Sequence, residues 1–280
     1  MWSECFDLYG KKTLSKADIL PELSRFPNVT VTYKKKQLLG AGMFGKTYKG
    51  IISETGQEIA VKKNSYKHAA QEDFTKHTEE MRIMAAIDHP NIVKMYAAFV
   101  QKKRFYIAME LMDENLQTFL KRSEQLLPLQ TCLQIALDIA TAVCYLHDQD
   151  ITHGDLGIHN AVLNSRGQAK LIDFGKSHRF TSNESENESS DFFNTKPEDV
   201  RDLATRFDLP LMSYMEDCVD KTLWHNTATL IYNLEPKKRP TAADTVSILK
   251  GIMNKVPFDF FIDISCDSTT NISVLNAVKR

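Results

Sequence analysis

An α+β fold of two lobes is predicted by three features of this sequence. Residues 29–110 contain short segments in which β-branched and apolar residues alternate with polar ones, which is the period of a strand. From Leu116 onward, apolar residues recur at intervals of three or four, which is the period of a buried helix. The pattern changes within residues 109–115. We therefore expect a strand-rich lobe of about residues 29–110, a short connector and a helical lobe of about residues 113–254.

The expected elements follow one another in a simple order. In the first lobe, the expected strands lie at residues 29–40, 46–52, 57–63, 94–100 and 104–110. One helix interrupts them, because Phe74, Met81 and Met84 recur at helical spacing within residues 71–88. In the second lobe, residues 127–147 form the clearest buried helix. The remaining expectations are two short strands around the turn 165–168, an N-terminal extension (1–28) with one short helix at 14–26, and a C-terminal tail (255–280).

Composition and charge exclude several classes of partner. The chain has 280 residues, of which 42% are hydrophobic, enough to bury the core of one large domain or two lobes. Its net charge of −1 predicts no basic surface for nucleic acid or an anionic membrane. The five cysteines contain no CxxC pair, so neither a disulfide framework nor a zinc site is expected. The chain begins without a signal-like segment and lacks an apolar run of about 18 residues, so we expect a cytoplasmic protein without a membrane span.

Glycines and a lysine in the first lobe suggest a site for phosphate. Gly40, Gly42 and Gly45 lie between two expected strands. Glycine lets backbone amides approach a phosphate closely, although a glycine-rich hairpin is often only a hairpin. Lys62 ends an alternating strand and shares its face with the small residue Ala60. A lysine on a strand is usually a solvated side chain, but this one has room beside it for a nucleotide.

Three polar residues follow the long helix of the second lobe. Asp155 and Asn160 lie in the segment HGDLGIHN, and Asp173 begins DFG. A base, an amide and a second carboxylate are the groups that hold a hydroxyl and Mg²⁺ ions around a transferring phosphoryl group. Glu80, in the helix of the first lobe, would by default be an exposed glutamate. It gains a role only as the ion-pair partner that holds Lys62.

The order of these segments resembles the protein kinase superfamily. GAGMFGKT resembles GxGxxGxV with Thr47 in place of the valine, IAVK resembles VAIK, HGDLGIHN resembles HRDLxxxN, and DFG is unaltered. DHPNIV, YLH and KKRPTA are also similar to kinase sequences. The resemblance runs from about Tyr33 to Met253. It implies a kinase-like bilobal domain over residues 29–254, with an antiparallel sheet and one helix in the N-lobe and a mostly helical C-lobe.

The resemblance also implies a role for each matching residue. The three glycines would cover the phosphates of ATP, Lys62 would bind the α and β phosphates, and Glu80 would hold Lys62. Asp155 would orient the acceptor hydroxyl or take its proton, and Asn160 and Asp173 would bind Mg²⁺. The adenine would be surrounded by Leu39, Thr47, Ala60 and Leu163, with Met109 at the back and Glu110 and Met112 as backbone hydrogen-bond partners.

Two departures from the family pattern affect regulation. Gly154 stands where the family has an arginine that binds a phosphate on the activation loop. Because glycine offers no side-chain donor, we expect an enzyme that does not need activation-loop phosphorylation; the alternative is that glycine merely suits the backbone there. The segment after Asp173 is also short, since Glu198 runs directly into Asp199 and the next helix. We therefore expect a reduced peptide-docking platform and an Arg239 without its usual glutamate partner.

A reduced platform resembles two groups of compact kinases. These are the small atypical kinases of the KEOPS complex and bacterial effector kinases that lack an activation segment. If the chain is a secreted effector of the second kind, it would act in the cytoplasm of a host cell. DLGIHN has Gly157 where serine/threonine kinases carry a lysine, and Gly157 and His159 resemble the tyrosine-kinase sequence DLAARN. Serine or threonine acceptors are favoured because the compact relatives use them. The acidic segment 181–191 is expected to be a mobile loop.

Three functions are compatible with this pattern. The first is an active, constitutively competent ATP-dependent protein kinase, whose partner would be a protein substrate or a regulatory protein. The second is a pseudokinase-like scaffold that binds a nucleotide and a protein partner. The third is a phosphotransferase that acts on a small molecule, since a reduced platform need not bind a peptide.

Overall fold

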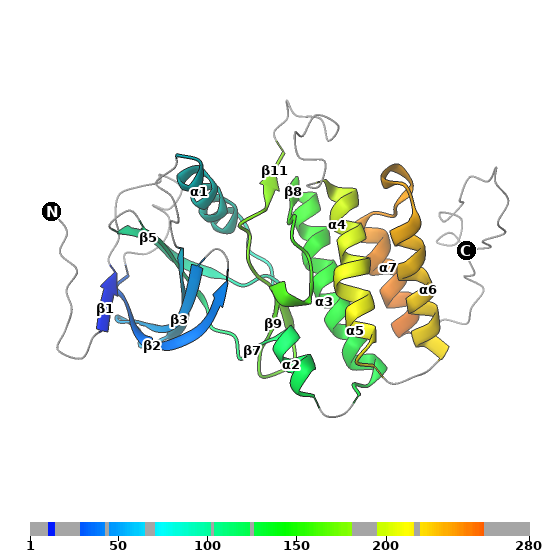
Figure 1. The fold of residues 1–280 in the computed structure, drawn as a ribbon, viewed down its shortest axis with the longest axis horizontal. Coiled ribbons are helices and arrows are strands. Elements are labelled where there is room, and N and C mark those ends of the chain that lie inside the picture. The colour runs from blue at the N-terminus through cyan, green and yellow to red at the C-terminus, as the bar shows by residue number, and fades with distance from the viewer. Residues whose placement is uncertain are drawn as a thin grey trace.

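The computed structural model describes residues 11–14, 29–42, 45–64, 71–101, 104–123, 126–180, 195–215 and 219–254. These residues form a lobe built on a sheet and a lobe built of helices, as Figure 1 shows. The predicted α+β class and the bilobal, kinase-like arrangement are therefore confirmed. The functional residues predicted from the sequence belong to both lobes.

The N-lobe contains one antiparallel sheet of six strands. In spatial order they are β1 (Lys11–Leu14), β2 (Val31–Gly42), β3 (Gly45–Ile52), β4 (Glu58–Asn64), β6 (Arg104–Glu110) and β5 (Met95–Gln101). Helix α1 (Gln71–Ala86) follows β4, where the sequence predicted the inserted helix. The alternation along β4 divides its side chains: Ile59 and Val61 join a small apolar cluster, and Ala60 joins the main core. Lys62 is thereby directed to the face of Ala60, as predicted.

Strand β1 lies within the segment that the sequence assigned to the N-terminal extension. Lys11 pairs with Lys34 and Leu14 pairs with Val31, so this short segment adds a strand to the sheet. Leu14 was expected to begin a helix and instead ends the strand. The rest of that expected helix, residues 15–26, lies outside the described residues.

The C-lobe consists mostly of helices. They are α2 (Leu116–Arg122), α3 (Leu129–Asp148), α4 (Lys196–Asp202), α5 (Leu209–Met212), α6 (Val219–Asn233) and α7 (Ala242–Met253). A π-helical segment, η3 (Leu203–Asp208), connects α4 to α5, and two 3₁₀ turns are η2 (Ile158–Asn160) and η4 (Pro236–Lys238). The short strands are β7 (Glu114–Asn115), β8 (Ile151–Thr152), β9 (Ala161–Leu163), β10 (Ala169–Leu171) and β11 (His178–Arg179).

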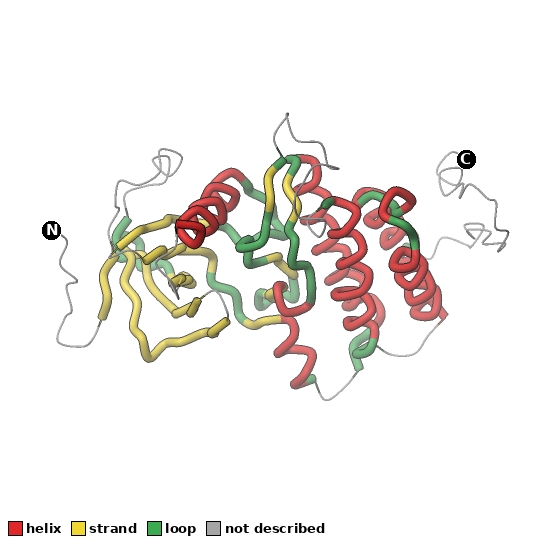
Figure 2. The backbone as a smooth tube through the Cα atoms, turned by 45° about the horizontal axis from the view of Figure 1, so that its top comes forward, coloured by secondary structure: helices red, strands yellow, loops and turns green. Residues whose placement is uncertain are grey.

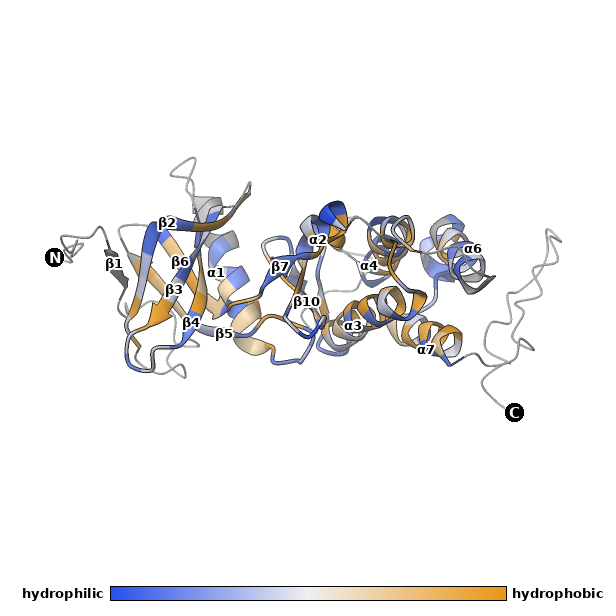
Figure 3. Cartoon of the chain, turned by 90° about the horizontal axis from the view of Figure 1, so that it is seen from below, coloured by the Kyte–Doolittle hydropathy of each residue, from blue (hydrophilic) through white to orange (hydrophobic). Residues whose placement is uncertain are grey.

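Helix α3 forms the centre of the C-lobe core. Its predicted apolar face, with Cys132, Ala136, Ile139 and Val143, is buried in the main cluster. Figure 3 shows apolar stretches on both α3 and α7, which pack side by side. By length and composition α3 could cross a membrane, but 56% of its apolar window is buried inside the protein. That burial is typical of a core helix.

The segments that carry HGDLGIHN and DFG lie between the two lobes. Figure 2 shows residues 151–180 as loops and short strands between the N-lobe sheet and the C-lobe helices. Strand β9 pairs with both β10 and β7, and β8 pairs with β11. The two strands predicted around the turn 165–168 are therefore confirmed. The acidic segment 181–191, predicted to be a loop, lies outside the described residues.

Candidate active site

Lys62 connects three separate elements. Its Nζ donates to Glu80 Oε1 at 2.5 Å and to Asp173 Oδ1 at 2.8 Å. Lys62 comes from β4, Glu80 from α1, and Asp173 from the loop after β10, 111 positions away along the chain. Glu80 is only 2% exposed, so it is not the solvated helical glutamate that a single helix would suggest. The ion pair that gives Glu80 a role is present.

Lys62 and Glu80 keep their charges although both side chains are buried. Burial alone would lower the pKa of Lys62, but Glu80 and Asp173 outweigh it and raise that pKa. Burial would raise the pKa of Glu80, but the charge of Lys62 and hydrogen bonds hold it at about 2. One of these bonds comes from Asn64, whose Nδ2 donates to Glu80 Oε2 at 3.2 Å. The ammonium and the carboxylate are therefore both ionised at neutral pH.

Asp155 lies between Asn160 and two cationic side chains. Asn160 Nδ2 donates to the main-chain carbonyl of Asp155 at 2.8 Å and to its Oδ2 at 3.3 Å. Asp155 Oδ1 accepts from Arg206 Nη2 at 3.1 Å and lies 3.1 Å from Lys176 Nζ. Burial alone would raise the pKa of Asp155, but Lys176 and Arg206 outweigh it and lower that pKa. The carboxylate is thus ionised and able to accept a hydrogen bond from an acceptor hydroxyl.

Asp199, in the first turn of α4, anchors the loop that carries Asp155. Its Oδ2 accepts the N–H of His153 at 2.7 Å, and its Oδ1 accepts the N–H of Gly154 at 2.9 Å. The His153 ring contacts Phe174 edge-on, with centroids 5.2 Å apart, which links the loop to the DFG segment. Gly154 has a φ of +72°, a left-handed conformation that side chains disfavour. Glycine therefore suits the backbone at this position. This agrees with the alternative given above, that glycine stands in place of the arginine because of the backbone conformation.

Asn160 and Asp173 are suited to hold Mg²⁺. The N–H of Ile172 donates to the carbonyl of Asn160 at 2.9 Å, so the two residues lie on adjoining backbone segments. Because Asn160 Nδ2 is turned to Asp155, the amide can offer its oxygen, the kind of ligand that Mg²⁺ prefers. Asp173 has a φ of +67°, a strained conformation typical of functional sites. In the described ranges no group of three His, Cys, Asp or Glu side chains could hold a metal alone. Mg²⁺ in such sites is usually bound by one or two side chains together with substrate phosphates.

The residues expected around the nucleotide lie on neighbouring strands of the sheet and on β9. The registered pairs in the sheet are Gly40 with Thr47, Thr47 with Lys62, and Ala60 with Met109. Ala60, Met109 and Leu163 are buried members of the main core, whereas Leu39 is 50% exposed. The apolar residues thus come from both lobes, and Leu39 is the exposed one among these four.

The three glycines differ in what the fold demands of them. A Cβ at Gly45 would lie 2.3 Å from the carbonyl oxygen of Lys63, so the start of β3 requires glycine. A Cβ at Gly40 or Gly42 would meet no described atom within 4 Å. The packing does not explain these two glycines. Open space beside their backbone is what close approach of a phosphate needs.

Glu110 is engaged by two neighbours. Its N–H donates to the carbonyl of Lys94 at 2.9 Å, and its carboxylate binds Lys170 Nζ at 2.9 and 2.8 Å. The expected hydrogen bond to adenine therefore cannot use the N–H of Glu110. Met112, the other expected backbone partner, follows in the connector between the lobes.

The expectation that Arg239 lacks a glutamate partner is wrong. Arg239 Nη1 donates to Glu198 Oε1 at 2.6 Å, and both side chains are buried. Glu198 and Asp199 are adjacent in the first turn of α4, and they serve different neighbours. The shortened segment therefore keeps the arginine–glutamate pair by placing the glutamate directly before the helix aspartate.

Two cations at the site were not predicted from the sequence. Lys176 follows the DFG segment directly, and that proximity is a signal that could have indicated it. Arg206 lies 51 positions beyond Asp155 and reaches it only through the packing of η3 against the loop. No motif marks Arg206, so the sequence carried no signal for it.

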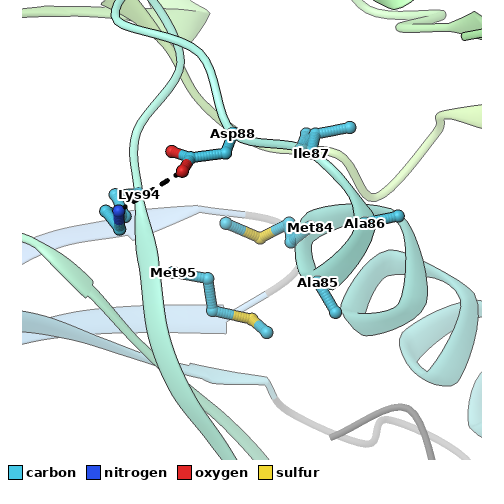
Figure 4. A pocket seen from close by; sticks show the side chains of 7 residues that line it. All are labelled: Met84, Ala85, Ala86, Ile87, Asp88, Lys94 and Met95. Carbon is cyan, nitrogen blue, oxygen red and sulfur yellow. Dashed lines mark hydrogen bonds and ion pairs between the residues drawn. The ribbon is translucent and has the colours of Figure 1, made fainter. Parts of the chain in front are cut away.

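A separate cavity of about 290 Å³ lies at the end of α1. Figure 4 shows its lining side chains, including Met84 and Met95, and the Asp88–Lys94 ion pair of 3.4 Å beside them. Met84 lies one helical turn after Glu80. None of the residues predicted to bind nucleotide or metal lines this cavity.

Comparison with known proteins gives consistent results. The protein kinase domain family matches residues 33–202. Human tyrosine-protein kinase Fer is 35% identical over 51% of this chain and 17% of its own length. The L-type lectin-domain containing receptor kinase V.5 of Arabidopsis thaliana is 34% identical over 53% of this chain and 23% of its own. CTD kinase subunit alpha of Schizosaccharomyces pombe is 30% identical over 55% of this chain and 26% of its own.

The chain thus spans about a quarter or less of the length of these relatives. The family match covers more than half of the chain and includes the residues predicted for phosphoryl transfer, which are Lys62, Glu80, Asp155, Asn160 and Asp173. The bilobal fold and the contacts among these side chains agree with that match. The chain therefore belongs to the protein kinase family, a family of phosphotransferases.

Proposed function

We propose that this chain is an ATP-dependent protein kinase that transfers the γ-phosphoryl group of ATP to a protein hydroxyl. One observation carries the proposal: Lys62 contacts Glu80 and Asp173 at hydrogen-bond distance. The two lobes thereby meet at an ion-paired lysine and a carboxylate that can bind metal. Asp155 and Asn160 lie on the adjoining loop and contact each other. These are the groups that phosphoryl transfer requires in this family.

Each side chain has a distinct role in the proposed reaction. Lys62 binds the phosphates, and its ion pair with Glu80 holds the ammonium in place before the substrate arrives. Asn160 and Asp173 hold Mg²⁺, which when bound neutralises charge on the phosphates. Asp155 accepts a hydrogen bond from the acceptor hydroxyl and orients its oxygen for attack. Positioning and charge stabilisation therefore supply most of the catalysis.

The proposed acceptor is serine or threonine. The support is the resemblance to compact kinases, and tyrosine is the alternative because a similar protein is the tyrosine-protein kinase Fer. Phosphoamino-acid analysis of a labelled mixture of protein substrates separates the two. We expect phosphoserine or phosphothreonine. Label found only as phosphotyrosine would contradict this part of the proposal.

The proposed enzyme does not depend on activation-loop phosphorylation. Gly154 has no side chain that could bind a phosphate, and its N–H is directed to Asp199. The Lys62–Glu80 pair forms between unmodified side chains. We expect treatment of the purified protein with a phosphatase to leave its activity unchanged. A large loss of activity, restored when the phosphate is replaced, would contradict this expectation.

A transfer assay with matched variants tests the main proposal. Purified protein is incubated with radiolabelled ATP, Mg²⁺ and generic protein substrates. We expect Asp155→Asn to lower the rate by about 10² to 10⁴, the usual effect of losing a positioned base. Lys62→Ala should also abolish most transfer. Lys63→Ala is the control, because Lys63 is the adjacent lysine and lies over the ring of Tyr106 on the opposite face of β4.

Other outcomes of this assay would favour other functions. Equal transfer by the wild type and both variants would contradict the proposal. Nucleotide binding without transfer would favour the pseudokinase-like scaffold. Transfer only to a small molecule, with no label in protein, would favour the small-molecule phosphotransferase.

A further inference from the structure

Arg206 brings a guanidinium to the candidate base from a part of the chain without a kinase motif. Its Nη2 donates to Asp155 Oδ1 at 3.1 Å, and its Nη1 donates to Asp202 Oδ2 at 2.9 Å. The planar guanidinium therefore spans two carboxylates and is held by one while it contacts the other. Asp202 is itself fixed, because its Oδ1 accepts from Arg201 Nη2 at 3.0 Å. The contact with Asp155 is thus supported by a second layer of ion pairs.

The backbone around Arg206 is unusual in the same place. Arg206 belongs to the π-helical segment η3. Such turns are rare in proteins, and those that occur are often at functional sites. A Cβ at Gly157 would lie 3.3 Å from the main-chain carbonyl oxygen of Arg206 and 2.7 Å from the His159 ring. The loop and the helix therefore approach each other closely at Gly157. A side chain at this position would displace the His159 ring and crowd the carbonyl oxygen of Arg206.

Lys176 and Arg206 contact the same oxygen but are held differently. Lys176 Nζ is a point charge on a flexible stem, and its side chain is about as exposed as that of Arg206, at 45% against 43%. Arg206 is fixed to Asp202 on its own helix and presents a rigid fork. On the other side of the carboxylate, His159 Nε2 lies 3.9 Å from Asp155 Oδ2. Arg206 therefore reaches Asp155 from a guanidinium that Asp202 also binds.

We propose that Arg206 is a positioning residue that fixes the carboxylate of Asp155. The inference rests on the proposed kinase function. Arg206 acts through Asp155 and is placed on the C-lobe helix, away from the strands expected to bind the nucleotide. Its loss should therefore lower kcat for phosphoryl transfer and leave KM for ATP unchanged.

Three variants of the full chain test this role. We expect Arg206→Gln to lower kcat by about 10- to 100-fold, because a small misplacement of a catalytic group costs up to about 10² in rate. Arg206→Lys should recover part of that loss, since it restores a cation within reach of Asp155. Lys196→Gln is the control: it removes a cation from α4 outside this network, since Lys196 pairs with Asp150. We expect it to retain kcat, and melting temperatures check that all three variants fold.

Two kinetic results would overturn the inference. One is an unchanged kcat in Arg206→Gln, and the other is an equal loss in Arg206→Gln and Lys196→Gln. Crystal structures give a test that does not depend on activity: in Arg206→Gln, the Asp155 side chain should leave the rotamer that it has in the wild type. An unchanged rotamer would overturn the inference. If the wild type transfers no phosphoryl group, the proposed function fails, and this structural comparison still decides whether Arg206 positions Asp155.

Discussion

Among the single residues, Lys62 and Glu80 carry charges in a place where charges are costly. Both side chains are largely buried, and their ion pair offsets the loss of water around them. The pair is therefore not a large net source of stability. Its importance appears when one partner is removed, because the other is then left buried without its counter-charge. Pre-positioned charge of this kind is also what phosphate binding requires.

Glu80→Gln tests how strongly the pair is coupled to folding. We expect the free energy of unfolding to fall by about 3 kcal/mol, because Lys62 is left buried with only Asp173 as a charged partner. Urea unfolding measures the change. Glu79→Gln is the control: Glu79 is the neighbouring, partly exposed glutamate, paired with Arg82 at 3.5 Å, and its loss should cost less than about 1 kcal/mol. Similar losses in both variants would show that burial of the pair is unimportant.

Asp208 predicts a dependence of stability on pH. It is buried at the end of η3, and its Oδ1 accepts no hydrogen bond from the described residues. Burial raises the pKa of its carboxyl to about 8, against a smaller opposing effect of Trp224. The folded protein therefore holds this proton more tightly than the unfolded chain, whose aspartates titrate near pH ~3.9. This contribution is fully present below about pH 4 and is lost as the pH rises through about 8.

Urea unfolding at a series of pH values checks this prediction. We expect the free energy of unfolding of the wild type to fall with rising pH by up to about 1.4 kcal/mol per pH unit from this group. Asp208→Asn cannot ionise, so its curve should be flatter between about pH 5 and 8. Parallel curves for the two proteins would exclude Asp208 as the cause.

Among the elements, helix α4 shows how a shortened segment can retain its contacts. Its first turn carries Glu198 and Asp199, and acidic side chains are favourable at a helix N-terminus. Glu198 binds Arg239 near the start of α7, and Asp199 binds the loop that carries Asp155. One turn of helix therefore connects the last part of the C-lobe to the candidate active site.

Arg239→Met tests the contribution of the Arg239–Glu198 ion pair to stability. Removing one partner of a buried pair should destabilise the protein by about 3 to 5 kcal/mol and lower its melting temperature clearly. Lys238→Met is the control, because Lys238 is the adjacent cation and its pair with Glu235 is exposed. Its loss should cost about 0 to 1 kcal/mol. Equal melting temperatures for the two variants would contradict a structural role for the Arg239–Glu198 pair.

The elements that were predicted have a local sequence pattern, whereas the elements that were missed depend on contacts with other parts of the chain. Strands β2 to β6 and helices α1 and α3 were predicted because apolar periodicity is a local property. Strand β1 was missed, since four residues carry little periodicity and its partner is β2. The π-helical segment η3 was also missed, because its geometry depends on packing against the loop at Gly157.

For the whole molecule, the candidate site lies between the lobes and depends on both. Lys62 and Glu80 belong to the N-lobe, and Asp155, Asn160 and Asp173 belong to the C-lobe. A ligand that binds this site contacts both lobes and binds only the folded state. It should therefore stabilise the protein as a unit.

Thermal unfolding with a non-hydrolysable ATP analogue and Mg²⁺ tests this expectation. At a ligand concentration about 100 times Kd, binding should add about 2.7 kcal/mol of stability and raise the melting temperature. Removing Mg²⁺ with EDTA should reverse most of the rise, because Asn160 and Asp173 would then face the phosphates without a cation. Lys62→Ala should show little rise. A rise of the same size in Lys62→Ala would place the nucleotide elsewhere.

The sequence by itself determined the fold class, the family and the identity of the candidate catalytic groups. Periodicity and short motifs are local, so Lys62, Asp155, Asn160 and Asp173 could be named without coordinates. The tertiary structure alone decided which groups meet: Glu198 with Arg239, and Arg206 with Asp155. These contacts join residues far apart along the chain and depend on how helix and loop pack, and no local pattern of residues encodes that packing.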